Sequence, residues 1–176
     1  EYAAAIEHQT KALEIKRELL GDKHPSVAGS LGNLANVHSR MGDHEGASRL
    51  YRQAFDIFSE SLGADHPYVG RCHDGIGKAE LALEHWDEAQ AQLERAVDIF
   101  SKSESTERNL AATRFMLAQA LRGADKEPAR AQKLARQSLE WTREAKTSGK
   151  KGATEGDIDE TIAEIEAFLG IGPDTP

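Results

Sequence analysis

Histidine and cysteine are the residue types of this sequence best suited to binding a metal ion or to nucleophilic catalysis. Seven histidines and one cysteine occur in 176 residues. His24 and His66 each precede a proline, in the related segments GDKHP and GADHP. Their recurrence predicts a structural role, such as capping or packing a turn, because zinc requires three or four converging ligands. The other histidines are expected to be ordinary surface or half-buried side chains, and we predict no metal site.

Cys72, His73 and Asp74 are adjacent, and their types are those of a nucleophile, a base and an orienting acid. Consecutive side chains of a helix point about 100° apart, so these three cannot converge on one another. We expect Cys72 to be a buried, inert thiol. The acidic pair Asp87-Glu88 is expected in the first turn of a helix, where it complements the helix dipole. The sequence therefore predicts no catalytic residue, no cofactor and no enzymatic activity.

Charge and hydropathy exclude two classes of partner. The chain carries 22 basic and 30 acidic side chains, a net charge of −8. This balance argues against nucleic acid as the main partner, because phosphate binding needs a basic surface. The apolar runs are only a few residues long, so we expect no membrane insertion, and no signal-peptide pattern is present. We expect a soluble protein of the cytoplasm.

An internal repeat organises most of the chain. An offset of 42 residues separates His24 from His66, and the same offset pairs Ala47 with Ala89 and Ala54 with Ala96. Within each unit the apolar residues recur at i, i+3 and i+4, which is typical of an amphipathic helix. Gly42 is expected to end one helix in the left-handed conformation, and Asp43 to cap the next. Each unit is therefore predicted to be a helix–turn–helix, and no segment shows the alternation of a strand.

Small and large residues alternate in these helices, with Ala47 and Ala54 seven residues apart, and this pattern resembles the tetratricopeptide repeat (TPR). The 42-residue length and the connector LGDKHPSVA followed by SLGNLA resemble the kinesin light chain type, which is also widespread in bacterial signalling proteins. The resemblance implies an all-α fold, a right-handed α-solenoid of antiparallel helix pairs with about eight helices. Residues 109–169 also resemble the TPR tails of myxobacterial-type serine/threonine protein kinases, although no kinase motif occurs here.

The repeat defines the expected organisation of the chain. Residues 1–146 are predicted to be the TPR array, in which 1–20 is the second helix of a truncated repeat and 25–62, 67–103 and 106–146 are helix pairs. A Gly-rich flexible loop is expected over 147–156, a capping helix over 157–169 that docks on 127–146, and a tail over 170–176. The missing partner of the first helix predicts an exposed apolar face at Tyr2, Ala5, Ile6, Ala12 and Ile15, through which the chain is expected to dimerise.

The family resemblance places the first helix of each pair on a concave groove that binds peptide. Asn36 and Gln119 are expected to pair with peptide N–H and C=O groups, and Arg40, Lys78 and Arg122 to hold an acidic side chain or a terminal carboxylate. The alternative is that these polar residues are merely solvated. The full candidate set is Asn33, Asn36, Ser39, Arg40, Arg71, Asp74, Lys78, Phe115, Gln119 and Arg122.

Three functions follow from this interpretation. The first is a non-catalytic scaffold module, part of a larger protein, that binds an extended and acidic segment of a protein partner in its groove. The second is the regulatory or sensory C-terminal region of a bacterial serine/threonine protein kinase. The third is a self-assembly segment that uses the open face of the first helix.

Overall fold

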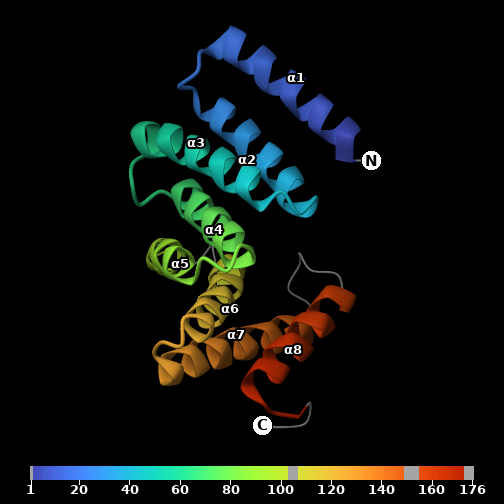
Figure 1. Cartoon of the computed structure of the whole chain (residues 1–176), viewed down its shortest axis with the longest axis vertical. Helices are drawn as coiled ribbons and strands as arrows, with labels where there is room; N and C mark the ends of the chain where they lie inside the picture. Colours follow the sequence, from blue (N-terminus) through green and yellow to red (C-terminus); the bar gives the residue numbers. More distant parts are fainter. Residues whose placement is uncertain (1, 103–106, 149–154, 173–176) are drawn as a thin grey trace.

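The chain forms a stack of α-helices in the computed structural model, which describes residues 2–102, 107–148 and 155–172 (Figure 1). No strand occurs among these residues, which confirms the predicted all-α class. The eight helices of the described residues are α1 (Tyr2–Leu20), α2 (Pro25–Arg40), α3 (His44–Leu62), α4 (Pro67–Ala82), α5 (Trp86–Ser101), α6 (Glu107–Gly123), α7 (Pro128–Ser148) and α8 (Glu155–Leu169).

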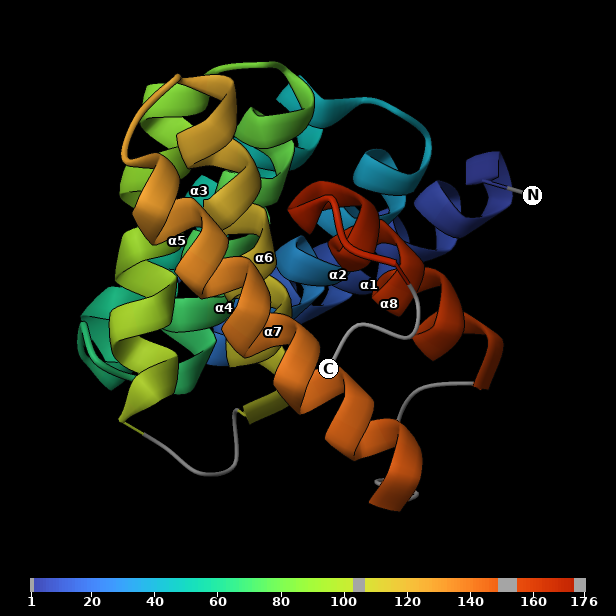
Figure 2. The same cartoon turned by 90° about the horizontal axis from the view of Figure 1, so that it is seen from below.

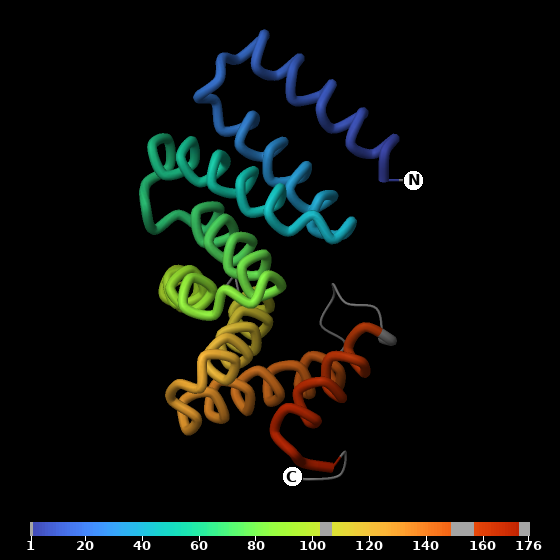
Figure 3. Tube along the Cα trace, viewed as in Figure 1, coloured from blue at the N-terminus to red at the C-terminus, as the bar shows by residue number. Residues whose placement is uncertain are grey.

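Consecutive helices pack as antiparallel neighbours, and the trace bends as it passes from α1 to α8 (Figure 3). The tightest pairs are α2 with α3, α4 with α5, and α6 with α7, and each pair then packs on the next through α3 with α4 and α5 with α6. The first helices also touch one another, α2 with α4 and α4 with α6. Figure 2 views the stack from its C-terminal end, with α7 and α8 nearest the reader. This is the predicted solenoid of helix pairs.

Histidine side chains cap the first helices of the first two full units, α2 and α4. The imidazole Nδ1 of His24 accepts a hydrogen bond from the backbone N–H of Ser26, and that of His66 accepts one from Tyr68, both at 3.1 Å. Proline follows each histidine, where its missing N–H leaves no donor unpaired. The recurring histidines are therefore N-caps, which confirms their structural role.

The turn inside the first full unit also has the predicted chemistry. Gly42 adopts a positive φ of 84°, and the Asp43 carboxylate accepts the N–H of Gly46 at 2.9 Å. A left-handed residue followed by a capping carboxylate satisfies backbone groups at both helix ends. The sequence therefore fixes where α2 ends and α3 begins.

Alternating small and large side chains fill the space between the helices. Ala35, Ala47, Ala54, Ala89 and Ala96 have no solvent exposure. Their short side chains let neighbouring helices approach closely, and larger residues pack around them. One core cluster centres on Leu31, Val69, Ile99 and Phe100, and a second on Leu93, Leu117, Leu121 and Ile165.

A histidine–carboxylate pair bridges the turn of each of the first two full units. In the first, His38 Nδ1 lies 2.7 Å from Asp43 Oδ2, and in the second, His85 Nδ1 lies 2.9 Å from Glu80 Oε2. Positions 38 and 80 are equivalent under the 42-residue offset, as are 43 and 85. The imidazole and the carboxylate have therefore exchanged places between the units while the pairing is kept.

The structure corrects the predicted ends of the last two helices. α7 continues to Ser148, two residues into the predicted loop, because the hydroxyl groups of Thr147 and Ser148 donate to the carbonyl of Glu144 and remain within the helix. α8 begins at Glu155 rather than 157. Residues 149–154 of the predicted loop and 173–176 of the predicted tail lie outside the described residues.

The outer face of α1 differs in part from the prediction. Tyr2 and Ile15 are about half exposed, as expected, and Leu19 is 76% exposed. Ala5, Ile6 and Ala12 are instead half-buried, and Ile6 packs against the first core cluster. α2 follows α1 in the stack and packs against it, which covers part of this helix.

Candidate functional site

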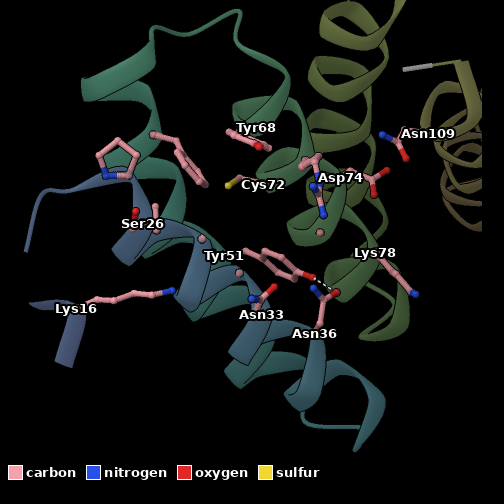
Figure 4. Close-up of a pocket in the computed structure, with 17 residues that line it drawn as sticks. Lys16, Ser26, Asn33, Asn36, Tyr51, Tyr68, Cys72, Asp74, Lys78 and Asn109 are labelled. Carbon is pink, nitrogen blue, oxygen red and sulfur yellow. Dashed lines mark hydrogen bonds between the residues drawn. The ribbon is translucent and has the colours of Figure 1, made fainter. Parts of the chain in front are cut away.

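A cavity of about 590 Å³ lies between α2 and α4 (Figure 4). Its size is within the range of ligand-binding pockets, about 300–1,000 Å³. Residues from α1, α3 and α6 complete its wall. The lining residues are Lys16, Pro25, Ser26, Ala28, Gly29, Gly32, Asn33, Asn36, Tyr51, Phe58, Tyr68, Arg71, Cys72, Asp74, Gly75, Lys78 and Asn109.

The same positions of the repeat line the cavity from both first helices. On α2 these positions include Gly29, Gly32, Asn33 and Asn36, at the spacing of one helix face. The 42-residue offset carries them onto four lining residues of α4, which are Arg71, Asp74, Gly75 and Lys78. The two walls are therefore equivalent in position and different in chemistry: α2 contributes glycine and amide groups, and α4 contributes three charged groups.

Three cationic side chains surround the cavity. Lys16 extends from α1 and donates to the Ser30 hydroxyl at 2.7 Å. Arg71 and Lys78 are exposed on α4, and the guanidinium of Arg71 lies 5.9 Å from the centroid of the Tyr68 ring. Their charges favour a negatively charged occupant, although the chain as a whole is acidic.

Asp74 is the acidic group of this wall, and it is half-buried between α4 and α6. The Thr113 hydroxyl donates to its Oδ1 at 2.5 Å. Burial raises the pKa of Asp74 to about 6, and this effect outweighs Thr113, Lys78 and Arg71, which all act to lower the pKa. Asp74 is therefore ionised above about pH 6, and below that value the wall gains net positive charge.

Tyr51 connects the two walls. Its hydroxyl donates to Oδ1 of Asn36 at 2.7 Å, as Figure 4 shows. Its ring lies against Gly75, where an added Cβ would come within 2.5 Å of the ring carbon Cζ. Burial raises the pKa of Tyr51 to about 12, so the phenol stays protonated and remains a donor. The Asn36 amide oxygen is thus engaged by the protein itself, and its NH₂ group remains as the donor to a ligand.

Half of the residues predicted for the groove meet in this cavity. Asn33, Asn36, Arg71, Asp74 and Lys78 all line it. Ser39 and Arg40 lie in the last turn of α2 and do not line it. The cavity thus includes the predicted residues of α2 and α4 except Ser39 and Arg40, which lie at the C-terminal end of α2.

The predicted groove residues of α6 are separate from the cavity, and two of them contact Phe168 of α8. Phe115 is only 7% exposed and meets the Phe168 ring edge-on, with centroids 5.5 Å apart. The Arg122 guanidinium lies 3.8 Å from the centroid of the same ring. The expectation that Phe115 faces an open groove is therefore wrong. Gln119 is half-buried and does not line the cavity.

Sequence reasoning missed several lining residues, and for some of them a signal was present. Tyr68 lies one turn before Arg71, a predicted groove residue, on the same face of the helix. This spacing indicates that Tyr68 also lines the cavity. Outside the cavity, the contact of Phe168 with Phe115 was also missed, although Phe168 lies three residues after Ile165 and beside the apolar stripe of the last helix. Lys16 and Tyr51 come from second helices, which the groove prediction did not include.

Cys72 lies at the wall of the cavity and is 3% exposed. Burial raises the pKa of its thiol to about 12, so the reactive thiolate is scarce near neutral pH. This confirms the expected buried thiol. Within the described ranges, no three histidine, cysteine or acidic side chains lie close enough together to hold a metal ion.

The comparison with protein families identifies the architecture. A sequence model described as tetratricopeptide repeat matches residues 1–60 and 29–102, which together span more than half of the chain. The chain belongs to the tetratricopeptide repeat family. TPR arrays generally mediate protein–protein interaction and are generally non-catalytic, so the chain is a protein-interaction scaffold of this type. No curated protein matches the sequence.

Solved structures share the TPR fold along almost the whole chain. Kinesin light chain nearly identical TPR-like repeats from Podosopora anserina superpose with a TM-score of 0.70 at 21% identity, covering 96% of this chain and 79% of that one. A point variant of the same protein gives 0.70 at 20% identity, with 96% and 87% covered. BtubC (BKLC) from P. vanneervenii gives 0.66 at 20% identity, with 99% and 60% covered.

These matches confirm the kinesin light chain-like TPR solenoid that the sequence predicts. At this level of identity they show the fold alone. No helix in the described ranges is long and apolar enough to pass through a bilayer.

Proposed function

We propose that this TPR array binds an extended, acidic segment of a protein partner in the cavity between α2 and α4. The observation that carries the proposal is the set of cationic groups around the cavity, Lys16, Arg71 and Lys78, in a chain whose net charge is −8. A positive site on an acidic protein favours acidic ligands.

The dimensions of the cavity fit an extended peptide. α2 lines the cavity from Pro25 to Asn36, which is about 18 Å of helix at about 1.5 Å per residue. About five or six residues of an extended chain, at about 3.3 Å each, cover that length. The exposed amides of Asn33 and Asn36 are the groups expected to pair with the peptide backbone, and Arg71 and Lys78 those expected to pair with its carboxylates. The ring of Phe168 packs on Phe115 and closes that position to a peptide, so the proposed site is centred on α2 and α4.

A displayed library of random peptides of about ten residues, which are longer than the wall of α2 when extended, tests the proposal. The library is selected on the wild-type protein and sequenced, and the enriched peptides are measured by fluorescence polarisation. We expect enrichment of peptides with two or more Asp or Glu residues. The double variant Arg71→Glu/Lys78→Glu should lose their binding, because it reverses two charges at the cavity.

Arg40→Glu is the matched control, because Arg40 is exposed on α2 and lies outside the cavity. It makes the same change of charge near the site without altering the wall. Enrichment without an acidic signature would contradict the proposal. Arg71→Glu and Lys78→Glu are also measured singly. Equal losses in Arg40→Glu and in either of them would contradict the proposal, because the attraction would then be a general surface effect.

The open face of α1 supports self-assembly as a second candidate. Ile15 and Leu19 are 49% and 76% exposed on the same side of the helix, one turn apart. Light scattering of Ile15→Lys/Leu19→Lys beside wild type tests it, and a dimer that persists in the variant rules out this face. The kinase-tail resemblance and the cytoplasmic location stay predictions.

A further inference from the structure

Two glycines in the middle of α2 have no structural reason within the fold. Gly29 and Gly32 occupy regular helical positions without a positive φ, and a Cβ built at either position meets nothing within 4 Å. Glycine is among the least favourable residues in a helix interior, because it loses the most backbone freedom on folding. Two of them within four residues of one helix therefore lower its stability without improving its packing.

The other glycines inside helices of the array differ in this respect. A Cβ at Gly70 would come within 2.8 Å of Phe100, one at Gly75 within 2.5 Å of Tyr51, and one at Gly77 within 2.6 Å of Leu93. These positions are glycine because a neighbouring side chain fills the space. Gly29 and Gly32 instead border the open cavity and are half-buried in its wall.

The equivalent residues of the next unit show which side chains are absent at Gly29 and Gly32. The 42-residue offset places Gly29 opposite Arg71 in the repeat and Gly32 opposite Asp74. Where α4 projects a guanidinium and a carboxylate toward the cavity, α2 has bare backbone. The cavity therefore has one wall that offers charged side chains and one that allows another chain to come close to the helix itself.

We propose that Gly29 and Gly32 are specificity-determining residues, at which the main chain of the bound acidic peptide lies directly against α2. The inference rests on the proposed function and adds the orientation of the peptide. An extended chain alternates its side chains, so a backbone seated on the glycines can direct acidic side chains toward Arg71 and Lys78 on the facing wall. A helical partner is disfavoured, because its side chains would hold its main chain away from α2.

The variants Gly29→Ala and Gly32→Ala test this, because they should change stability and binding in opposite directions. Alanine restores helix propensity and meets no neighbour, so each variant should raise the melting temperature by about 2–4 °C. The added methyl group occupies the space of the peptide backbone, so the affinity for the acidic peptides of the displayed library should fall at least about tenfold. Gln53→Ala, at an exposed position of α3 outside the cavity, should leave that affinity unchanged.

A scan of the strongest acidic library peptide, N-methylated at one position at a time, provides the reciprocal measurement. We expect N-methylation to abolish binding at one position, or at two positions that are adjacent or one residue apart. At these positions the added methyl group would meet α2. Affinity retained by both glycine variants, a lowered melting temperature in either, or tolerance of N-methylation at every position would overturn the inference. Failure of the wild-type protein to select any acidic peptide would instead overturn the proposed function, on which this inference depends.

Discussion

Replacing Glu80 should expose how strongly the second full unit depends on one buried carboxylate. Glu80 is 7% exposed and accepts hydrogen bonds from Ser48 Oγ at 2.7 Å, His85 Nδ1 at 2.9 Å and Arg52 Nη2 at 3.3 Å. These donors come from α3 and from the turn after α4. Together they lower the pKa of Glu80 against the opposing effect of burial, with the Ser48 hydrogen bond the largest of the lowering causes.

The cost of Glu80→Gln follows from these contacts. Hydrogen bonds to a charged acceptor contribute about 1.5–3 kcal/mol each, and neutral ones about 0.5–1.5 kcal/mol. The Ser48 bond is buried, whereas Arg52 is about half exposed and its share is discounted for solvent screening. We expect the free energy of unfolding to fall by about 2 kcal/mol at pH 7, which lowers the melting temperature by about 4–8 °C in a chain of this size.

Urea unfolding, followed by circular dichroism from pH 7 down to about pH 3, measures how much Glu80→Gln lowers the free energy of unfolding and how this loss depends on pH. A lowered carboxyl pKa stabilises the fold above the unfolded value of about 4.3, and this stabilisation is lost as the pH falls through the folded value. The difference between wild type and Glu80→Gln should therefore shrink below about pH 4. Glu84→Gln, at an exposed position of the same turn, is the control. A difference that stays constant with pH would refute the assignment to the Glu80 charge.

Three further outcomes follow from the described contacts. Asp74→Asn should stabilise the fold by about 1–2 kcal/mol at pH 8 and by little at pH 4. Burial raises the pKa of Asp74 to about 6, so the cost of the carboxyl to the fold builds up between the unfolded pKa of about 3.9 and that value and is complete above it. Urea unfolding at the two pH values measures this. Phe168→Ala should loosen α8 by removing the ring that covers Phe115, seen as faster hydrogen exchange in residues 158–169. Cys72 should react with a thiol reagent only after urea unfolding, because it is buried and its pKa is raised to about 12.

The repeat made most of the fold predictable, because each local signal agreed with the others. The offset that pairs His24 with His66 located both helix starts, and the structure shows both imidazoles as N-caps. Gly42 and Asp43 located the turn between α2 and α3 for a similar reason, since a positive φ and a capping carboxylate are local requirements. Such features depend on a few neighbouring residues and can therefore be read without the tertiary structure.

The candidate site was predictable only as far as the repeat is regular. Asn33, Asn36 and Arg71 meet at the cavity because α2 and α4 keep the 42-residue relation. Phe115 was misplaced because α8, which lies outside the repeat, brings Phe168 against it. The partners of Glu80 come from positions 32 residues before it and five after it, and no sequence pattern indicates such a buried network. Contacts made by irregular elements and by buried charges require the structure.

The contact of Tyr51 with both walls has a consequence for how such a protein can change its ligand. Tyr51 belongs to α3, the second helix of its pair, yet it touches Gly75 of α4 and donates to Asn36 of α2. Tyr51 thus sets the separation of α2 and α4, and selection or protein engineering can alter this residue without changing the charged groups of α4. Substitutions in the supporting helices would retune the width of the site, while the pattern of charges continues to define the chemistry of its ligand. Under the proposed function, the charged groups of α4 contact the ligand, and Tyr51 of α3 sets the distance between α2 and α4.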